Sequence, residues 1–513
     1  MSKPKGMVMN PLIASLLRPE AYPHPTAAIK LRETHSAWVL LTGPYAYKLR
    51  KPVNFGFLDF STPAKRRWFA REELRLNRRL SPDLYIDLVP VQGIELAVRM
   101  RQFNEDNLLP AVLERGALST NAVEALAEEL AIFHSEAAVA REEDGFGTAP
   151  VIQEPVLENL KALAGVEELR ASLESLSAWL EQTFAELQPF FAERLASGCI
   201  RECHGDLHLG NMHLEGDRIR VFDCLEFNPS LRWIDTISEM AFLVMDLQVR
   251  EQQPLAMRAL NSWLDHSGNW SGLVGWRWYS VYRALVRAKV AQLRYLQHPE
   301  QKEAAEERNR YVEHAIDCSQ AQAQALLITH GLSGSGKSWL CRQIAAELPA
   351  LQLRSDVERK RLFGLWGEPR QKSMEGELYS RQSSAMLFER TLPRQAEAVL
   401  RGGFTPLVDA CFLRRSERQR MAALAKQQGV PLVILKLETP LPLIKARIET
   451  RQRQGLDPSD ATWEVVLQQR QWCEPISAME RSEAAVLELL EPIDAAAALE
   501  RIRALIRWQA QQS

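Results

Sequence analysis

Gly331-Leu-Ser-Gly-Ser-Gly-Lys-Ser338 is the stretch that decides the fold of the C-terminal part of this chain. It matches the pattern GxxxxGK[ST], in which glycines let backbone N–H groups turn inward around an anion. The β-rich run Ala325–Thr329 precedes it, and a helical pattern begins at Ser338. Because a helix N-terminus adds partial positive charge, the segment predicts a phosphate-binding loop between a strand and a helix. The flanking strand argues against the alternative, a Gly-Ser turn that happens to precede a helix.

The polar groups of this loop are the candidate nucleotide-binding residues. Lys337 is expected to reach the outer phosphates, and the hydroxyl of Ser338 is expected to ligate Mg²⁺. Asp409 ends the apolar run Pro406–Asp409, where a carboxylate would hold the Mg²⁺ through water. Helix capping is an equally good interpretation of Asp409, so its role stays open. The other candidates contribute backbone N–H groups, and they are Gly331, Ser333, Gly334, Ser335 and Gly336.

Strand-like runs follow the loop and alternate with helical segments. They are Leu351–Arg354, Thr405–Asp409 and Leu432–Leu437. This alternation is typical of a parallel sheet covered by helices, so we expect an α/β domain over residues 323–513.

Three charged residues of this part favour a kinase over a motor protein. Asp356 follows the second strand, beside the crevice where open α/β sheets bind ligands, and there a carboxylate orients or deprotonates an acceptor hydroxyl. Arg447 and Arg451 lie four apart on a helical segment before Gln452–Asp457, so they share one face. From that face they would close over the transferring phosphates as a lid. A solvated helix face is the alternative for the two arginines.

Residues 326–460 resemble the small P-loop kinases grouped with polynucleotide kinases, gluconate kinases and zeta toxins. The resemblance rests on GLSGSGKS, RSDVERKRLFG, LVDACFLRR and RIETRQRQGLDPSDA. It implies ATP-dependent phosphorylation of a hydroxyl, with Asp356 as the acceptor-site base and with Arg447 and Arg451 as lid residues. It does not fix the acceptor.

The N-terminal residues predict a small antiparallel sheet with one helix against it. The helix begins after Thr62, which is placed to cap it, has Pro63 in its first position and continues to Leu80. Beyond Asn107 the pattern is mostly helical, with one β-rich interruption at Cys199–Phe222. The expected strands are Ala28–Arg32, Trp38–Thr42, Tyr45–Lys51, Leu84–Val91 and Ile94–Met100.

The β-rich interruption contains His204-Gly-Asp-Leu-His-Leu-Gly-Asn211, and a short hairpin separates it from Asp223. Phosphoryl transfer needs a carboxylate at the acceptor hydroxyl and metal ligands on the nucleotide phosphates. Asp206 and Asn211, five apart, and Asp223 supply that set. The HxDxxxxN spacing with a trailing Asp therefore predicts a kinase-like catalytic loop.

The cysteines raise one competing interpretation. Seven cysteines are too few and too scattered for a disulfide framework, and a reducing cytoplasm fits best. Zinc-like spacing is present at Cys199, Cys203, His204 and His208. No second ligand pair follows at a usual separation, and zinc would leave the carboxylates of the loop without a role, so the kinase interpretation is preferred.

A kinase-like site also needs a lysine on an N-terminal strand and a glutamate on the helix to pair with it. Tyr45-Ala-Tyr-Lys48 supplies the lysine by its AxK pattern on the third strand. Glu72 and Glu73 compete as partners, and Glu73 shares its helix face with the apolar residues Phe69, Leu76 and Leu80. A carboxylate on an apolar face needs a partner, so we expect Glu73 to pair with Lys48, the alternative being a surface glutamate.

Residues 28–296 resemble the aminoglycoside phosphotransferase and choline kinase superfamily. The closest part of that superfamily is its uncharacterised bacterial branch, which is often fused to a P-loop kinase-like domain. The resemblance implies that Asp206 is the catalytic base, that Asn211 and Asp223 hold Mg²⁺, and that Lys48 and Glu73 form the ion pair. It also implies a hinge at Arg99–Phe103 near the adenine.

The sequence departs from this superfamily in its first hairpin. Thr34-His-Ser36 lacks the glycine-rich GxGxxG pattern, so phosphate cover would come from Ser36 and nearby backbone. The acceptor side is expected in the segment Leu225–Asp235. Its candidates are Glu226, Asn228, Arg232 and Asp235, and ordinary capping and ion pairing explain each of them about as well.

We therefore expect two domains, a bilobal protein-kinase-like α+β domain over residues 1–322 (lobes about 1–102 and 103–322) and the α/β P-loop domain after it. The preferred function is an ATP- and Mg²⁺-dependent phosphotransferase, a kinase with an alcohol acceptor. The alternatives are a nucleotide-sensing ATPase and a kinase of nucleic-acid ends. A net charge of −2 gives no general attraction to polyanions, so a small-molecule acceptor is preferred over nucleic acid. No membrane partner is expected, and the acceptor stays unknown.

Overall fold

The structure is a computed structural model that describes residues 10–56, 58–366, 378, 380–454, 459 and 461–510. Contacts divide the chain into two compact units, and each is described by itself. Unit 1 comprises Met1–Ala122, Glu136–Gly147 and Gly198–Glu239, and unit 2 comprises Val123–Ser135, Thr148–Ser197 and Met240–Ser513. The predicted boundary near residue 323 stays a prediction, since these units follow a different division.

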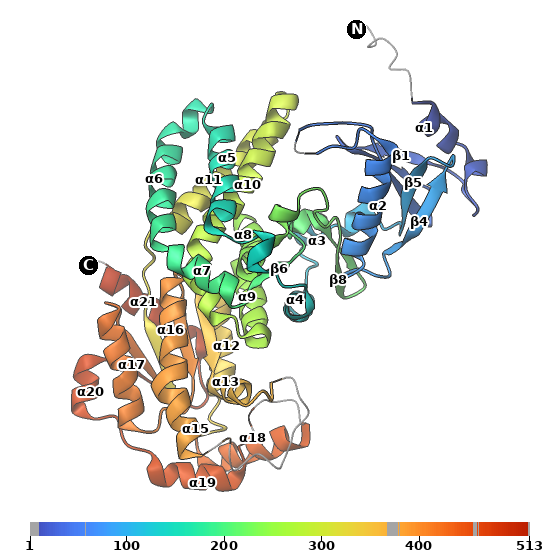
Figure 1. Cartoon of the computed structure of the whole chain (residues 1–513). Coiled ribbons are helices and arrows are strands. Elements are labelled where there is room, and N and C mark those ends of the chain that lie inside the picture. Colours follow the sequence, from blue (N-terminus) through green and yellow to red (C-terminus); the bar gives the residue numbers. More distant parts are fainter. Residues whose placement is uncertain are drawn as a thin grey trace. The chain divides into compact units, whose positions relative to one another are not determined.

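Unit 1 contains a five-stranded antiparallel sheet with strand order β1-β2-β3-β5-β4 (Figure 1). The strands are β1 (Lys30–Glu33), β2 (Ala37–Leu41), β3 (Tyr45–Arg50), β4 (Tyr85–Val91) and β5 (Glu95–Arg101). Helix α2 (Pro63–Asn77) begins as expected, because the side chain of Thr62 accepts a hydrogen bond from the backbone N–H of Lys65. It ends at Asn77, three residues earlier than predicted.

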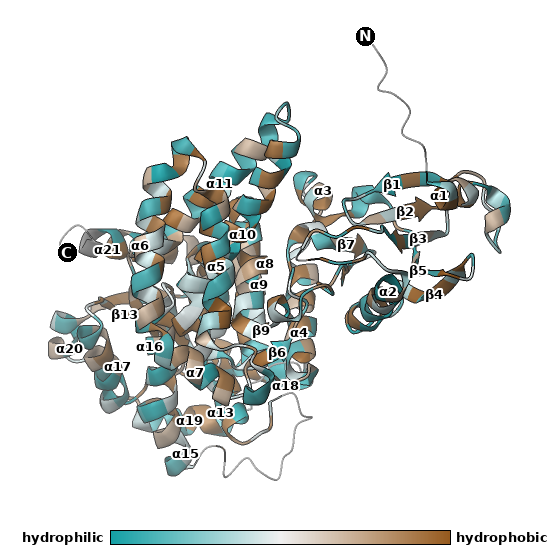
Figure 2. Ribbon diagram, turned by 45° about the horizontal axis from the view of Figure 1, so that its top comes forward, coloured by the Kyte–Doolittle hydropathy of each residue, from teal (hydrophilic) through white to brown (hydrophobic). Residues whose placement is uncertain are grey.

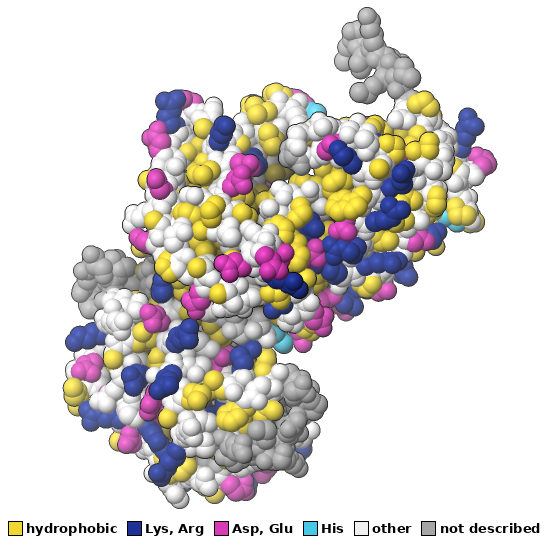
Figure 3. Space-filling model, in the orientation of Figure 1, with side chains coloured by type: hydrophobic (Ala, Val, Ile, Leu, Met, Phe, Trp, Pro, Cys, Tyr) yellow, Lys and Arg dark blue, Asp and Glu magenta, His cyan; other side chains and the backbone are white. Residues whose placement is uncertain are grey.

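The core of this sheet lies on both of its faces. One cluster includes Leu40, Tyr47 and Leu49, and a second joins Ala70 of α2 to Tyr85 and Val98. The opposite face of α2 carries basic side chains, which gather over that region in Figure 3.

The loop His204–Asn211, which the sequence predicts to be catalytic, lies between short strands of unit 1. They form two antiparallel pairs, β6 (Ile200–Glu202) with β9 (Trp233–Asp235) and β7 (Met212–Glu215) with β8 (Arg218–Val221). Strand β9 was not predicted, because three residues are too few for a period-two pattern. Shorter helices α1 (Pro11–Leu16) and α3 (Leu109–Glu114) belong to the same unit.

The helical region supplies the first part of unit 2. Its helices are α5 (Ala149–Leu163), α6 (Arg170–Glu186), α7 (Gln188–Ala196), α9 (Gln253–Ser267), α10 (Trp276–Gln297) and α11 (Lys302–Ser319), with a 3₁₀ segment at Trp270–Gly275. Helices α4 (Thr120–Glu136) and α8 (Thr236–Val249) begin in unit 1 and continue into unit 2. Along α6, brown and teal residues alternate in Figure 2, consistent with the burial of Leu173, Leu176 and Leu180 on one face.

The rest of unit 2 is built on a five-stranded parallel sheet with strand order β11-β12-β10-β13-β14. The strands are β10 (Leu326–His330), β11 (Ala350–Arg354), β12 (Thr405–Asp409), β13 (Leu432–Glu438) and β14 (Ala485–Leu490), the last of which was not predicted. The helices are α12 (Lys337–Glu347), α13 (Ser355–Leu362), α15 (Arg381–Met386), α16 (Leu392–Arg401), α17 (Arg415–Gln427), α18 (Leu441–Gln454), α19 (Trp463–Trp472), α20 (Ala478–Glu483) and α21 (Ala495–Ala510). A buried cluster that includes Leu327, Ile344 and Leu435 joins the sheet to α12 and α21.

Within unit 2, α9 lies beside β11 and α12 (Figure 1). The side chain of Asn261 donates to the Ala350 carbonyl at 3.1 Å and accepts from the Gln352 N–H at 2.7 Å. The indole N–H of Trp270 donates to the buried Glu358 of α13 at 3.0 Å. Residues from the helical region and the parallel sheet are thus joined by buried polar contacts.

These elements confirm the expected fold class, an antiparallel N-terminal sheet and a helical region followed by a parallel-sheet domain. Within the described ranges, no helix combines the length and apolar character that crossing a membrane requires.

Candidate active sites

The first candidate site lies in unit 1, around Lys48 of β3. Its ammonium lies 2.8 Å from Glu73 Oε1 and 2.7 Å from Asp223 Oδ1. Burial alone would lower the pKa of Lys48, but the carboxylates of Asp223, Glu73 and Glu226 hold it well above its usual value. The structure therefore brings together the lysine, the helix glutamate and the trailing aspartate from three separate stretches of sequence.

Asp223 has an unusual backbone for a residue other than glycine, with φ at 63°. Its N–H donates to the hydroxyl of the buried Tyr85 at 3.1 Å. Burial alone would raise the pKa of Asp223, but the adjacent Lys48 keeps it below its usual value. The carboxylate is thus held ionised, as a ligand for a divalent cation must be.

Asp206 and Asn211 are five residues apart in the loop His204–Asn211 and contact each other. The Asn211 amide donates to the Asp206 carboxylate at 2.9 Å and to its backbone carbonyl at 3.0 Å. The Phe222 N–H donates to the Asn211 carbonyl at 2.9 Å, which places Asn211 beside the residue that precedes Asp223. Carboxylate and amide oxygens are the ligands that Mg²⁺ prefers, so this donor set fits the cation that the kinase-like loop implies.

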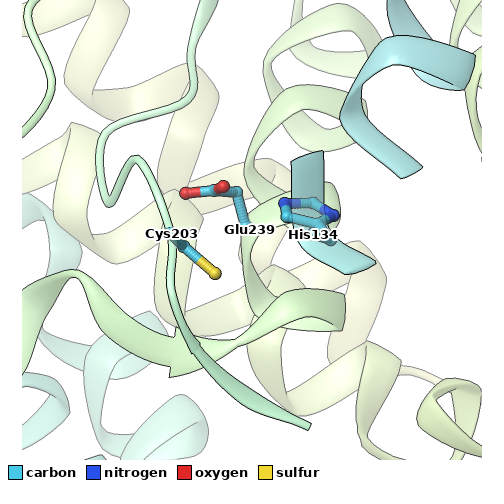
Figure 4. A group of neighbouring side chains, drawn as sticks. All are labelled: His134, Cys203 and Glu239. Atoms are coloured by element: carbon cyan, nitrogen blue, oxygen red, sulfur yellow. The ribbon is translucent and has the colours of Figure 1, made fainter. Parts of the chain in front are cut away.

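Glu239, at the start of α8, fixes the first residues of the loop. Its two carboxylate oxygens accept from the backbone N–H groups of His204 at 3.1 Å and Gly205 at 2.6 Å. Figure 4 shows it beside Cys203. Gly205 has φ at 88°, and a Cβ there would lie 2.9 Å from the Leu231 carbonyl, so only glycine fits. Glu239 was not among the residues that the sequence singled out.

The two histidines of the loop are engaged within it. His204 accepts from the Asp206 N–H at 3.3 Å, and its other ring nitrogen lies 3.0 Å from the Phe222 carbonyl. His208 accepts from the Gly210 N–H at 3.0 Å, and its Nε2 lies 3.4 Å from the Asp206 carboxylate. Because these ring nitrogens already have protein partners, the arrangement favours orientation of Asp206 over the zinc interpretation.

The remaining candidates of unit 1 have recorded structural partners. Phe103, at the end of the expected hinge, stacks on His213 with ring centroids 4.0 Å apart. Arg232 pairs with Glu202 at 3.2 Å, while Asn228 caps a short 3₁₀ turn and the Asp235 carboxylate accepts from the Ile237 N–H. Capping and ion pairing, the alternative that the sequence left open, describe these contacts.

The second candidate site lies in unit 2, at the loop between β10 and α12. Gly331, Gly334 and Gly336 all have positive φ, and a Cβ on Gly334 would meet Ile444 and Ile448 at 3.1 and 3.2 Å. The Lys337 ammonium donates to the carbonyls of Gly331 at 3.1 Å and Leu332 at 2.7 Å. The side chain of Lys337 is thus held by the backbone of the phosphate-binding loop itself.

This loop borders a cavity of about 840 Å³. The register Arg354↔Asp409 between β11 and β12 brings the ends of both strands to the same edge. Asp356, in the first turn of α13 after β11, and Asp409 therefore line one cavity together with Ser338. Asp409 accepts from the Gln352 side chain at 3.0 Å, and no capping contact is recorded for it in the described structure. A lysine, a hydroxyl and carboxylates around one cavity fit a magnesium-bound nucleotide.

The two expected lid arginines also line this cavity, and each has a partner. Arg447 pairs with Glu491 at 2.7 Å, and Arg451 donates to the Ala461 carbonyl at 2.8 Å. Of the segment Gln452–Asp457 that follows them, residues 455–457 lie outside the described residues. Ser333 and Gln469 of α19 exchange two hydrogen bonds, at 2.9 and 3.0 Å, across the same cavity. No sequence pattern points to Gln469, because its contact with Ser333 depends on the packing of α19.

Comparison with known proteins agrees with these two parts. Residues 326–476 match the family model described as "AAA domain". An uncharacterized protein of Mycobacterium tuberculosis and one of Mycobacterium bovis are each 30% identical over 448 residues, which covers 85% of this chain and 88% of the relative.

Two solved structures are similar to portions of this chain. A choline/ethanolamine kinase family protein from Mesorhizobium loti covers 60% of this chain and 99% of its own, with 11% identity and a TM-score of 0.39. A gluconokinase from Sinorhizobium meliloti covers 37% of this chain and 96% of its own, with 19% identity and a TM-score of 0.24.

The fold and the site residues define a protein of two parts, an antiparallel-sheet unit with a lysine–glutamate ion pair and a parallel-sheet P-loop domain. The chain belongs to the family of the two mycobacterial proteins, which match it across both parts.

Proposed function

We propose that this protein is an ATP-dependent phosphotransferase with two nucleotide sites, each of which phosphorylates a hydroxyl group. The observation that carries the proposal for the first site is the position of Lys48, within 2.8 Å of both Glu73 and Asp223. A lysine so placed contacts the α- and β-phosphates of a nucleotide in kinase-like sites. The cavity that joins Lys337, Ser338 and Asp356 supports a second site.

In the first site, Asp206 accepts the proton of the acceptor hydroxyl, and its contacts with Asn211 and His208 orient its carboxylate. Asn211 and Asp223 would hold Mg²⁺, which when bound neutralises charge on the phosphates. In the second site, Asp356 has the same acceptor role, and Arg447 and Arg451 stabilise charge that develops during transfer.

The acceptors we propose are small molecules. A cavity of about 840 Å³ lies within the size range of pockets for a nucleotide and a small second ligand. Nucleotide sensing without transfer is the second candidate for unit 1, and the intact set of Lys48, Asp206, Asn211 and Asp223 speaks against it.

The test is transfer of labelled γ-phosphate from ATP into fractionated metabolites and RNA by the full chain. Asp206→Ala and Lys337→Ala separate the two sites, because each removes a residue of only one of them. We expect two sets of labelled products, each lost in one variant. ATP binding without any labelled product would support the sensing function, and label only in RNA ends would support the nucleic-acid alternative.

A further inference from the structure

Arg50 is a second cation beside Lys48, and it was not among the candidate residues of the sequence analysis. The two residues are two apart on β3, so their side chains leave the same face of the sheet. One guanidinium nitrogen of Arg50 lies 2.5 Å from Glu73 Oε2, and the other lies 2.7 Å from Glu226 Oε1. All three side chains are at least nine-tenths buried. Such a buried group of charges persists only when every member has a partner.

Each oxygen of the Glu73 carboxylate therefore has its own cation. Lys48 contacts Oε1, and Arg50 contacts Oε2. The Arg50 guanidinium also lies 4.6 Å from the ring centre of Phe60, a fully buried residue just before α2. Glu73 is thus tied to β3 twice, and its position does not depend on Lys48 alone.

Glu226 connects the same arginine to the metal-binding segment. It lies three residues after Asp223, whose N–H is already held by Tyr85. Burial raises the pKa of Glu226, and Arg50 opposes that shift. Arg50 consequently joins β3, helix α2 and the segment after β8 through contacts that leave Lys48 free to change partners.

We propose that Arg50 and Glu226 are positioning residues that keep Glu73 and Asp223 in place while Lys48 exchanges the Asp223 carboxylate for the nucleotide phosphates. The ion pair of this site would then be permanently assembled, rather than formed by movement of α2. The inference rests on the proposed nucleotide role of unit 1.

The experiment uses the full chain carrying Lys337→Ala, so that calorimetric titration with ATP reports on the first site. The test variant is Glu226→Gln. The matched control is Glu95→Gln, which removes the carboxylate partner of another buried arginine of unit 1, Arg66, away from the site. Each variant is titrated with and without Mg²⁺, and its melting temperature is recorded.

We expect Glu226→Gln to weaken Mg²⁺-dependent ATP binding by about 10–100-fold, as loss of outer-shell partners does in metal sites. Glu95→Gln should lower the melting temperature without changing ATP affinity. The double variant Arg50→Met with Glu226→Met replaces the buried pair by apolar side chains of similar length, so it should recover stability but not ATP affinity.

Three outcomes decide between the proposals. Equal ATP affinity in Glu226→Gln and Glu95→Gln, or full affinity in the double variant, would overturn the positioning role. If Glu226→Gln does not fold, the ATP affinity of the double variant alone tests the positioning role. If the Lys337→Ala parent binds no ATP, the proposed function of unit 1 fails, and the inference fails with it.

Discussion

Lys48 and Lys337 are the two candidate phosphate-binding lysines, and the chain holds them in opposite ways. Lys48 is fixed by carboxylates from α2 and from the segment after β8, both distant in sequence. Lys337 is held by the carbonyls of Gly331 and Leu332, a few residues away in its own loop. The position of Lys48 consequently depends on tertiary contacts, whereas the position of Lys337 is determined within the phosphate-binding loop itself.

The carboxylates of the two sites differ in a related way. Asp223 lies against Lys48, while Asp356 lines an open cavity at the edge of the parallel sheet. Substitutions in the first site should therefore disturb several partners at once, because buried charges share them. Substitutions in the second site should have narrower effects, and the following predictions test this contrast.

The largest effect is expected from removing the acceptor-site carboxylates. Asp206→Asn and Asp356→Ala should each reduce transfer by their own site by about 10²–10⁴-fold, the usual contribution of general base catalysis. Neither should change ATP affinity, because the proposed function assigns both residues to the acceptor rather than to the nucleotide. Phosphate transfer and calorimetry on the same preparations measure the two quantities. Loss of ATP binding in Asp356→Ala would make that residue a metal or nucleotide ligand and remove the kinase role.

Asp223→Asn should affect binding as well as transfer. The substitution removes a charged ligand and the partner of Lys48, so we expect Mg²⁺-dependent ATP affinity to fall by about 10–100-fold. Titration in the Lys337→Ala background measures this loss. Asp409→Asn in a matched Lys48→Ala background, which removes the phosphate-binding lysine of the first site, gives the corresponding value for the second site. If Asp223→Asn retained full affinity, the contrast between base and metal ligand in unit 1 would be wrong.

A smaller effect should show that the helical region stabilises the parallel-sheet part of unit 2. Trp270→Phe removes the indole N–H that donates a hydrogen bond to Glu358. This loss should lower the free energy of unfolding by about 1–3 kcal/mol. Trp278→Phe is the control, because Trp278 is also buried and its indole nitrogen has no hydrogen-bond partner in the described structure. Urea unfolding of both variants gives the difference. Equal losses would leave only ring packing as the role of Trp270.

The smallest effect concerns pH and unit 1. Burial lowers the pKa of His213 from 6.5 to about 4. Between these two pH values the imidazole is therefore protonated in the unfolded chain but neutral in the folded protein. Stability should therefore be fully present above pH 6.5 and fall between pH 6.5 and 4. His213→Phe, which keeps an aromatic ring against Phe103, should make this decline shallower by less than about 1.4 kcal/mol per pH unit. Thermal unfolding over this range measures the decline, and an unchanged slope would contradict the assignment.

Much of the fold could be predicted from local patterns. The expected strands of both sheets are present with small shifts at their ends, since alternating apolar runs and turn residues act over a few neighbours. Strands β9 and β14 were not predicted. Strand β9 has only three residues and forms by pairing with β6, and β14 is an edge strand that pairs with β13. The formation of these two strands therefore depends on tertiary pairing.

The residues of the candidate sites can likewise be divided into those predicted from local sequence patterns and those placed by tertiary contacts. The sequence by itself determined the phosphate loop at residues 331–338 and the spacing of Asp206 and Asn211, because contiguous residues share one backbone path. Helical spacing also distinguished Glu73 from Glu72, and the structure joins Glu73 to Lys48.

Only the tertiary structure decided the contacts between distant stretches. It placed Arg50 between Glu73 and Glu226, and it joined Trp270 to Glu358. No short-range pattern predicts these contacts. A buried charged group or indole N–H needs a hydrogen-bond partner, and the packing of distant segments decides which group lies close enough to serve as that partner.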